Sequence, residues 1–324
     1  MKAAVYDHPG PPEVLHLADV PDPEPGPADV LIRVEAISIE GGDTLARGDT
    51  TAPAAAGPHI VGYQAAGTVL AVGADVTRFA EGDRVVTVSF DGSHAELRAV
   101  PEAVCWAVPD GLAVDQASAI PIPFGTASDC LFEFGRLQAG ETALIHAGAS
   151  GVGIAAIQLA HAAGATVLAT ASQDAKLERL VDYGLDHGIN YAKANFVEEV
   201  RLLTGGRGAD VIVDSVGGQT LVDSLTALAY RGRCVTVGDA GRQAGQPLDI
   251  SNLRGNNQSL TGYFLGAELF TGTRAYAMIA DLFDQVADGR LRVVIDRTFP
   301  LAEAAAAHAY IESRQSFGRV LLIP

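Results

Sequence analysis

The stretch Ala147-Gly148-Ala149-Ser150-Gly151-Val152-Gly153-Ile154-Ala155-Ala156 decides the fold of this chain. Gly151, Gly153 and Ala156 give it the spacing G-x-G-x-x-A, between a short apolar run and an apolar helical pattern. The first Gly permits a tight turn, the second lets the backbone approach a pyrophosphate, and the small third residue lets the helix pack on a sheet. This context favours a dinucleotide site, held by Ser150, Gly151, Val152 and Gly153 at the helix N-terminus, over helix packing alone.

Around this turn, from about residue 121, short apolar strands alternate with helical patterns. Such alternation is typical of βαβ units and a parallel sheet. The predicted helices are about 151–163 and 176–183, and the predicted strands are 142–146, 166–170, 187–190, 210–214, 234–237 and 259–263. We therefore expect an α/β fold with a doubly wound Rossmann sheet in this part of the chain.

The two ends of the chain have a different pattern. The first 120 or so residues are β-rich, with apolar runs at 30–34, 67–72 and 84–88 and a Pro-rich surface loop at 21–27. Near the C-terminus, 273–288 and 301–313 have the pattern of amphipathic helices, and 319–323 that of a strand. We expect this last strand to return to the first domain.

Composition bounds the function classes. The length of 324 residues suggests two domains, and the net charge of −17 disfavours nucleic acid and anionic membrane surfaces as partners. The three scattered cysteines form no CxxC pair, which fits a reducing compartment. We see no signal peptide and no membrane-spanning run, and expect a soluble cytoplasmic protein.

The residues after the second strand indicate which dinucleotide is bound. An NAD site usually has Asp or Glu at the strand tip, whereas here the strand ends Ala169-Thr170-Ala171-Ser172-Gln173. Ser172 and Lys176 offer a donor and a positive charge for a 2′-phosphate, although Asp174 lies nearby. Alternatively, Ser172 is a helix N-cap and Lys176 a solvated surface residue. The pattern favours NADPH.

The whole chain resembles the zinc-free quinone oxidoreductase (zeta-crystallin-like) branch of the medium-chain dehydrogenase/reductase family. The matching segments are Met1–Ala4, Asp43–Arg47, Val72-Gly73, Glu81–Val85, Gly148–Gly153, Ile189–Tyr191, Asp214–Gly218, Gly232-Arg233 and Gly318–Pro324. The resemblance implies a GroES-like β-barrel catalytic domain built from residues 1–120 and 265–324, and a Rossmann NADPH-binding domain at 121–264. It also implies a cofactor in the cleft between them and a homodimer formed through the sheet edge at 259–263.

Further cofactor contacts follow from the same resemblance. Ser172 and Lys176 match positions that face the 2′-phosphate, and Tyr191 a position near the adenosine. The other candidate cofactor-binding residues are Thr126, Val216, Val237, Gly238, Tyr263, Phe264 and Arg314. Core or interface packing is the alternative role for Tyr191, Tyr263 and Phe264.

Zinc-dependent members of the wider family carry a Gly-His-Glu motif after a catalytic Cys. This chain has Gly62-Tyr63-Gln64 there and Ser38 at the Cys position, so we expect no metal site. Without a Lewis acid to stabilise an alkoxide, conjugated acceptors suit the site better, because hydride addition to C=C yields a delocalised enolate or a hydroquinone.

The proton donor is less clearly marked. Glu40 stands where relatives often have Asn, and it is either a buried acid with a raised pKa or a brace for the Gly41-Gly42 turn. Tyr63 is a second candidate donor, with core packing as the alternative. For Asp43 and Arg47 we expect an intramolecular brace.

Together these features predict an NADPH-dependent reductase of small quinones, enones or other conjugated carbonyl compounds. Two alternatives remain open. One is a stand-alone enoyl-thioester reductase of a polyketide or fatty-acid type pathway, and the other is a non-catalytic NADPH-binding protein.

Overall fold

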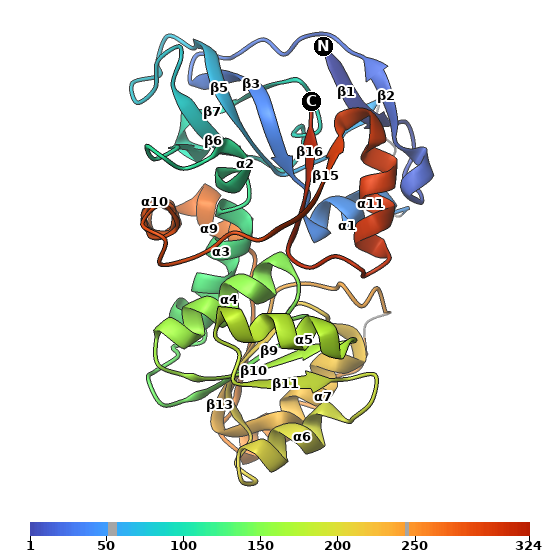
Figure 1. Cartoon of the computed structure of the whole chain (residues 1–324), viewed down its shortest axis with the longest axis vertical. Coiled ribbons are helices and arrows are strands. Elements are labelled where there is room, and N and C mark those ends of the chain that lie inside the picture. Colours follow the sequence, from blue (N-terminus) through green and yellow to red (C-terminus); the bar gives the residue numbers. More distant parts are fainter. Residues whose placement is uncertain (51–56, 244–245) are drawn as a thin grey trace. The chain divides into compact units, whose positions relative to one another are not determined.

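The computed structural model describes residues 1–50, 57–243 and 246–324. These residues form two compact units (Figure 1). The first unit contains both ends of the chain, Met1–Ile122 and Gly266–Pro324, and the second contains Pro123–Leu265. No helix in the described ranges is long and apolar enough to cross a bilayer.

The first unit is built on a seven-stranded sheet. Its strands, in spatial order, are β15 (Ile295–Pro300), β16 (Arg319–Ile323), β3 (Asp29–Ser38), β5 (Gln64–Val72), β6 (Arg84–Val88) and β8 (Cys105–Ala107), while β7 (Leu97–Pro101) also pairs with β3. The predicted C-terminal strand is present as β16, and it runs antiparallel to β3 with Leu321 opposite Ser38. This pairing sets the last residues of the chain beside the loop that carries Glu40.

A second, three-stranded sheet completes the first unit, in the order β2 (His16–Asp19), β1 (Lys2–Tyr6) and β4 (His59–Ile60). The helices of this part of the chain are α1 (Gly41–Gly48), α2 (Val114–Ala117), α9 (Leu265–Thr271), α10 (Arg274–Ala287) and α11 (Ala304–Glu312). Alternate residues of β3, Val30, Ile32 and Val34, are buried in the same core as Val320 and Leu322 of β16. The period-2 pattern of β3 therefore predicts correctly which of its side chains face inward.

The second unit is a six-stranded, wholly parallel sheet in the order β11-β10-β9-β12-β13-β14. Its strands are β9 (Thr142–Ile145), β10 (Thr166–Ala171), β11 (His187–Asn190), β12 (Ala209–Asp214), β13 (Leu228–Thr236) and β14 (Ser259–Gly262). Its helices are α3 (Pro121–Ser128), which begins before the unit boundary, α4 (Gly151–Ala162), α5 (Asp174–Leu180), α6 (Phe196–Leu203), α7 (Gly218–Ala227) and α8 (Ser251–Gly255). The predicted α/β fold with a Rossmann sheet is confirmed.

Helices cover both faces of this sheet. Leu144 and Leu168 pack in one core with Val200 of α6 and Leu225 of α7. Since successive strand residues point to opposite faces, the other face is left for α4 and α5, which contact β9, β10 and β11 (Figure 1). Strands covered on both faces read as continuous apolar runs, which is why these were easy to predict.

Three differences from the sequence prediction have simple causes. The strand expected at 234–237 instead runs as Leu228–Thr236, so it begins earlier than expected and ends one residue sooner. Helix α5 starts two residues before the expected Lys176, and its last turn, Val181–Tyr183, is a 3₁₀ helix that closes at the left-handed Gly184. Strand β15 was not predicted, because it is mostly half-exposed and contains charged residues instead of an apolar run.

Candidate functional site

Apart from Thr126 on α3 and Lys176 in α5, the predicted cofactor-binding residues of the second unit lie at one edge of its sheet. Each follows the carboxyl end of a parallel strand: Ser150 to Gly153 follow β9, Ser172 follows β10, Tyr191 follows β11, Val216 follows β12, Val237 and Gly238 follow β13, and Tyr263 and Phe264 follow β14. In open parallel α/β sheets, ligands bind outside the carboxyl ends of the strands. The topology therefore brings these residues to the edge at which a dinucleotide binds.

The glycine turn is held by contacts within the chain. Ala147 has a left-handed φ of 50°, and the Ser150 hydroxyl caps α4 by accepting the Gly153 N–H at 3.0 Å. The Gly151 and Val152 N–H groups, in the first helical turn, have no intrahelical partner and suit an anion. A Cβ on Gly153 would lie 2.4 Å from the Ala147 carbonyl oxygen. Gly153 is thus required by the turn itself, in addition to any approach of a pyrophosphate.

A backbone hydrogen bond joins the ends of β10 and β11. The Tyr191 N–H donates to the Ala171 carbonyl at 3.1 Å, which sets Tyr191, nearly half exposed, beside Ser172. Helix α5 has Gln173 at its N-cap position, so the alternative role of Ser172 as N-cap is wrong. Lys176 is largely buried, so it is not the solvated surface residue of the other alternative.

The carboxylate of Asp174 is engaged by two neighbours. The Asn190 amide donates to one oxygen at 2.6 Å, and the Lys193 ammonium pairs with the other. Both contacts lower the pKa of Asp174, the Asn190 hydrogen bond most. An NAD site presents a carboxylate whose oxygens accept the ribose hydroxyls. In this chain both oxygens of Asp174 already have a partner. This edge of the sheet therefore fits the phosphorylated ribose of NADPH better than the unphosphorylated ribose of NADH.

The remaining strand ends are shaped by polar contacts. An Asp214 oxygen at the tip of β12 accepts the N–H groups of Val216 at 2.7 Å and Gly217 at 3.0 Å, which fixes the turn after the strand. The Tyr263 hydroxyl donates to the Asp129 carboxylate at 2.8 Å, so Tyr263 has the packing role considered for it, whereas Phe264 is more than half exposed. Phe264 is thus more exposed than Tyr263 at this end of the sheet.

In the first unit, Glu40 lies at the centre of a buried polar cluster. Its carboxylate forms an ion pair with Arg319 of β16 and accepts a hydrogen bond from the Gln64 amide at 2.5 Å. Arg319 also donates to the Ser38 hydroxyl at 2.8 and 3.0 Å. Glu40 is 4% exposed and Arg319 is 7% exposed, so the charges are removed from water together.

Gln64 connects this cluster to the start of α3. Its side-chain oxygen accepts the N–H of Ile122, in the first turn of that helix, at 3.1 Å. Thr126, one turn further along α3, is buried. The carboxamide of Gln64 thus joins the Glu40 cluster to Ile122 within the first unit.

Burial dominates the electrostatics of the cluster. It raises the pKa of Glu40 from 4.5 to about 7, although the Arg319 guanidinium and the Gln64 amide oppose the rise. Asp43 is fully buried, and desolvation raises its pKa to about 8. A carboxyl group with a pKa near neutrality can change protonation state during turnover at neutral pH.

Tyr63 lies over the glycine turn that follows Glu40. A Cβ on Gly42 would lie 2.4 Å from the Tyr63 ring, so the pair Gly41-Gly42 makes room for the tyrosine. Burial, with Asp43 and Glu40 nearby, raises the pKa of Tyr63 to about 12, so its hydroxyl keeps its proton. A protonated, partly exposed phenol is a hydrogen-bond donor for a developing oxyanion.

Asp43 and Arg47 brace the same region, as the sequence predicts. The Asp43 carboxylate accepts the N–H of Glu40 at 2.8 Å and that of Tyr63 at 3.2 Å, which holds the two candidate donors at a fixed spacing. Arg47 forms an ion pair with Glu312 of α11. Arg314, the last predicted cofactor contact, follows α11 in a left-handed conformation with φ of 58°.

The positions at which zinc-dependent relatives carry ligands are used differently here. Ser38 accepts hydrogen bonds from Arg319, and Gln64 binds Glu40. Within residues 1–50, 57–243 and 246–324, no group of three or more His, Cys, Asp or Glu side chains is arranged to hold a metal ion.

Two residues of these clusters were missed by sequence reasoning. Arg319 meets Glu40 across 279 positions of sequence, and nothing local marks the pair. Lys193 had a weak sequence signal, because it follows the predicted contact Tyr191 by two positions. In the structure it lies in a turn, where its N–H donates to the Asn190 carbonyl at 3.0 Å.

Comparison with known proteins agrees with this arrangement. Residues 26–110 match the family model for the alcohol dehydrogenase GroES-like domain, and residues 151–284 match that for zinc-binding dehydrogenases. The chain is 37% identical to the quinone oxidoreductase of Pseudomonas aeruginosa, over 97% of both chains. It is 35% identical to a 2-haloacrylate reductase from a Burkholderia species, over 99% of this chain and 98% of that one.

A solved structure extends the likeness to three dimensions. The Escherichia coli quinone oxidoreductase, crystallised in complex with NADPH, superimposes with a TM-score of 0.94 at 29% identity and covers both chains completely. Sequence identity and fold thus agree over the full length. The chain belongs to the zinc-free quinone oxidoreductase, or zeta-crystallin-like, branch of the medium-chain dehydrogenase/reductase family.

Proposed function

We propose that this protein is an NADPH-dependent oxidoreductase that reduces small conjugated carbonyl compounds, quinones and enones among them. The observation that carries the proposal is the carboxyl edge of the parallel sheet. There a capped glycine turn presents free helix N–H groups, and the Asp174 carboxylate near the second strand tip is already engaged. Relatives that reduce quinones and 2-haloacrylate share the fold and the sequence pattern.

The candidate residues divide into those that bind the cofactor and those that act on the substrate. Bound NADPH supplies the hydride. The first turn of α4 binds the pyrophosphate, and Ser172, Lys176 and Tyr191 receive the 2′-phosphate end of the adenosine. Thr126, Val216, Val237, Gly238, Phe264 and Arg314 remain proposed contacts, and Tyr263 supports the strand end through Asp129.

On the substrate side, we propose that the Tyr63 hydroxyl donates a hydrogen bond to the carbonyl oxygen of the acceptor, where negative charge develops after addition to the C=C bond. Glu40 is so deeply buried that only a small part of its side chain could contact a substrate. Its role is to supply or hold a proton behind the tyrosine, and its pKa of about 7 suits that role at neutral pH.

Glu40→Gln tests this assignment. We expect kcat/KM with a small quinone to fall about 10²-fold, the range for loss of a positioned acid, and its pH dependence near pH 7 to disappear. Tyr63→Phe should lower kcat more than it raises KM, because the hydrogen bond strengthens as charge develops. A Glu40→Gln enzyme with the wild-type pH–rate profile would leave Glu40 a purely structural role.

Lys176→Ala tests the choice of cofactor. The variant should raise the Kd of NADPH by about tenfold and leave that of NADH nearly unchanged, because only NADPH carries the extra phosphate that the ammonium can pair with. Equal losses for both cofactors, measured by calorimetric titration, would count against the assignment.

The substrate class is tested by an acceptor panel assayed with NADPH. A small quinone, an enone and crotonyl-CoA, each assayed at several concentrations, separate the main proposal from the enoyl-thioester alternative. We expect kcat/KM to be higher for the free conjugated carbonyl compounds than for the thioester. Tight cofactor binding without reduction of any acceptor would point to the non-catalytic alternative.

Three further assignments stay predictions. They are the domain boundaries at 1–120, 121–264 and 265–324, the homodimer and the cytoplasmic location. The proposed dimer would use the edge strand β14, which has an unpaired side in this sheet order. The location is supported by the three buried cysteines, which are all free thiols. The net charge of −17 disfavours nucleic acid as a partner, which also stays a prediction.

A further inference from the structure

The Asp174 carboxylate lies close to the strand tip at which an NAD site keeps its acid. Asp174 follows Gly153 by 21 positions (174 − 153) and opens α5 three residues after Ala171, the last residue of β10. An acid about 20 residues beyond the glycine motif is the usual partner of the ribose 2′-hydroxyl. A carboxylate this near the proposed ribose site favours NADH and opposes a 2′-phosphate.

Its two oxygens are both occupied by residues of the turn after β11. Asn190, which stands opposite Ala171 in the sheet, donates its amide to one oxygen at 2.6 Å. The next three residues turn back, with the Lys193 and Ala194 N–H groups donating to the Asn190 carbonyl at 3.0 and 3.1 Å. This turn brings the Lys193 ammonium to the second oxygen of Asp174.

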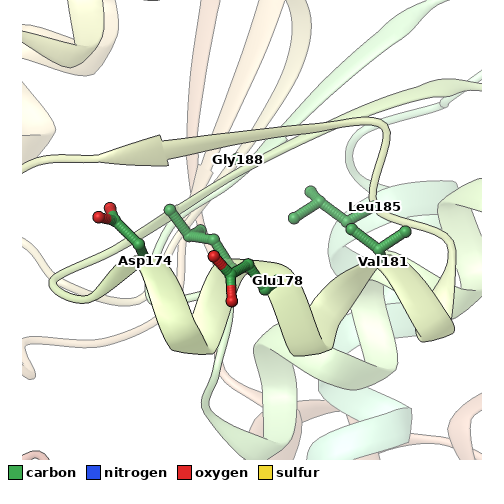
Figure 2. A pocket seen from close by; sticks show the side chains of 6 residues that line it. Asp174, Glu178, Val181, Leu185 and Gly188 are labelled. Carbon is green, nitrogen blue, oxygen red and sulfur yellow. The ribbon is translucent and has the colours of Figure 1, made fainter.

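A second acid, one helical turn from Asp174, adds to the negative charge that Lys193 offsets. Glu178 lies one helical turn after Asp174, and both line the same shallow pocket on α5, together with Leu177, Val181, Leu185 and Gly188 (Figure 2). Without Lys193, two carboxylates would stand close to the end of the sheet that receives the ribose. A phosphate dianion placed there would meet like charge.

We propose that Lys193, with Asn190, is the element that makes this enzyme select NADPH over NADH, by engaging the carboxylate that would otherwise bind the ribose hydroxyls. The inference rests on the proposed function and adds a specificity-determining pair to it. In this arrangement Lys193 has two effects. It removes the acceptor that favours NADH, and it cancels the charge that opposes the 2′-phosphate.

The pair is well suited to this role because it adds little to stability. Lys193 is 67% exposed and Asp174 is 52% exposed, and exposed ion pairs contribute little to folding. Its loss should therefore change cofactor preference without unfolding the unit. That separation distinguishes a specificity role from a structural one.

The test titrates NADPH and NADH into four proteins: wild type, Lys193→Ala, Asp174→Asn and the double variant. We expect Lys193→Ala to raise the Kd of NADPH by about tenfold and to leave that of NADH unchanged or lower, since the freed carboxylate can accept ribose hydroxyls. Adding Asp174→Asn to Lys193→Ala should restore NADPH binding to within about threefold of wild type, because the exposed charge is gone.

Lys2→Ala is the matched control, since it breaks the similarly exposed pair Lys2–Asp19, 3.3 Å apart, in the first unit. It should leave both Kd values unchanged. A Lys193→Ala protein with an unaltered NADPH to NADH ratio, or a double variant that shows no recovery, would overturn the inference while wild-type NADPH binding leaves the proposed function standing. Failure of the wild type to bind NADPH would overturn both.

Discussion

Gly153→Val will abolish NADPH binding and destabilise the second unit. A Cβ at this position would meet the Ala147 carbonyl oxygen at 2.4 Å and the Gly148 carbonyl oxygen at 2.7 Å, both of which are backbone atoms that cannot rotate away. Overpacking of this kind costs on the order of 3 kcal/mol, which corresponds to a Tm about 6–12 °C lower for a unit of this size. The distorted turn would also misplace the Gly151 and Val152 N–H groups. Thermal unfolding and calorimetric titration measure the two effects.

Gly255→Ala is the control for this variant. It places a methyl group on another helical glycine of the same unit, at which a Cβ would have no neighbour within 4 Å. We expect unchanged cofactor binding and a Tm equal to or slightly above that of wild type, because alanine restricts the unfolded chain. If Gly153→Val bound NADPH as tightly as Gly255→Ala, the glycine turn would not be the cofactor site.

Arg319→Met will destabilise the first unit by about 3–5 kcal/mol, the usual cost of removing one partner of a buried ion pair. The variant leaves the Glu40 carboxylate buried without its cation, and it removes the donors that hold the Ser38 hydroxyl. Adding Glu40→Gln should recover a large part of the loss, because the unpaired charge is then absent. Chemical denaturation of the single and double variants measures this recovery.

The loss should depend on pH in a defined direction. Burial already raises the pKa of Glu40 above its ordinary value of 4.5, to about 7, and removal of Arg319 raises it further. An acid whose pKa is higher in the folded state stabilises the fold fully below about pH 4.5 and loses that contribution as the pH rises through the folded-state pKa. The Arg319→Met variant should therefore lose more stability at about pH 8 than at about pH 5.

Arg33→Met provides the matched control, since Arg33 lies on β3 of the same sheet and pairs with Glu35 at 3.6 Å in an exposed position. Its loss should cost less than about 1 kcal/mol at either pH. An Arg319→Met protein as stable as Arg33→Met would mean that the Glu40 cluster does not hold the two ends of the chain together.

The sequence predicts the second unit better than the first for a physical reason. Strands of a parallel sheet covered on both faces are largely apolar runs, and β10 begins at the predicted Thr166 and ends one residue after the predicted Thr170. In the first unit, half-exposed strands such as β15 contain several polar residues, here Asp296 to Thr298 in a row, and leave a weak local signal. The glycine turn was recognisable because its motif is local.

Local sequence patterns could not predict the polar clusters around Glu40 and Asp174. The position of Glu40 marked it as a candidate acid, but its partner Arg319 comes from the last strand, and only the pairing of β16 with β3 brings them together. In the same way, Asp174 counted against the predicted NADPH site, and only the turn after Asn190 brings Lys193 to its carboxylate. Both cases depend on contacts between strand ends that the order of residues does not encode locally.

The most direct test of the account is a calorimetric titration of the purified wild-type protein with NADPH and, in parallel, with NADH. We predict one site per chain, with NADPH bound at least about tenfold more tightly than NADH, because Lys176 and Lys193 lie near the end of β10 and the Asp174 carboxylate is already engaged. The absence of NADPH binding, or tighter binding of NADH, would contradict the account.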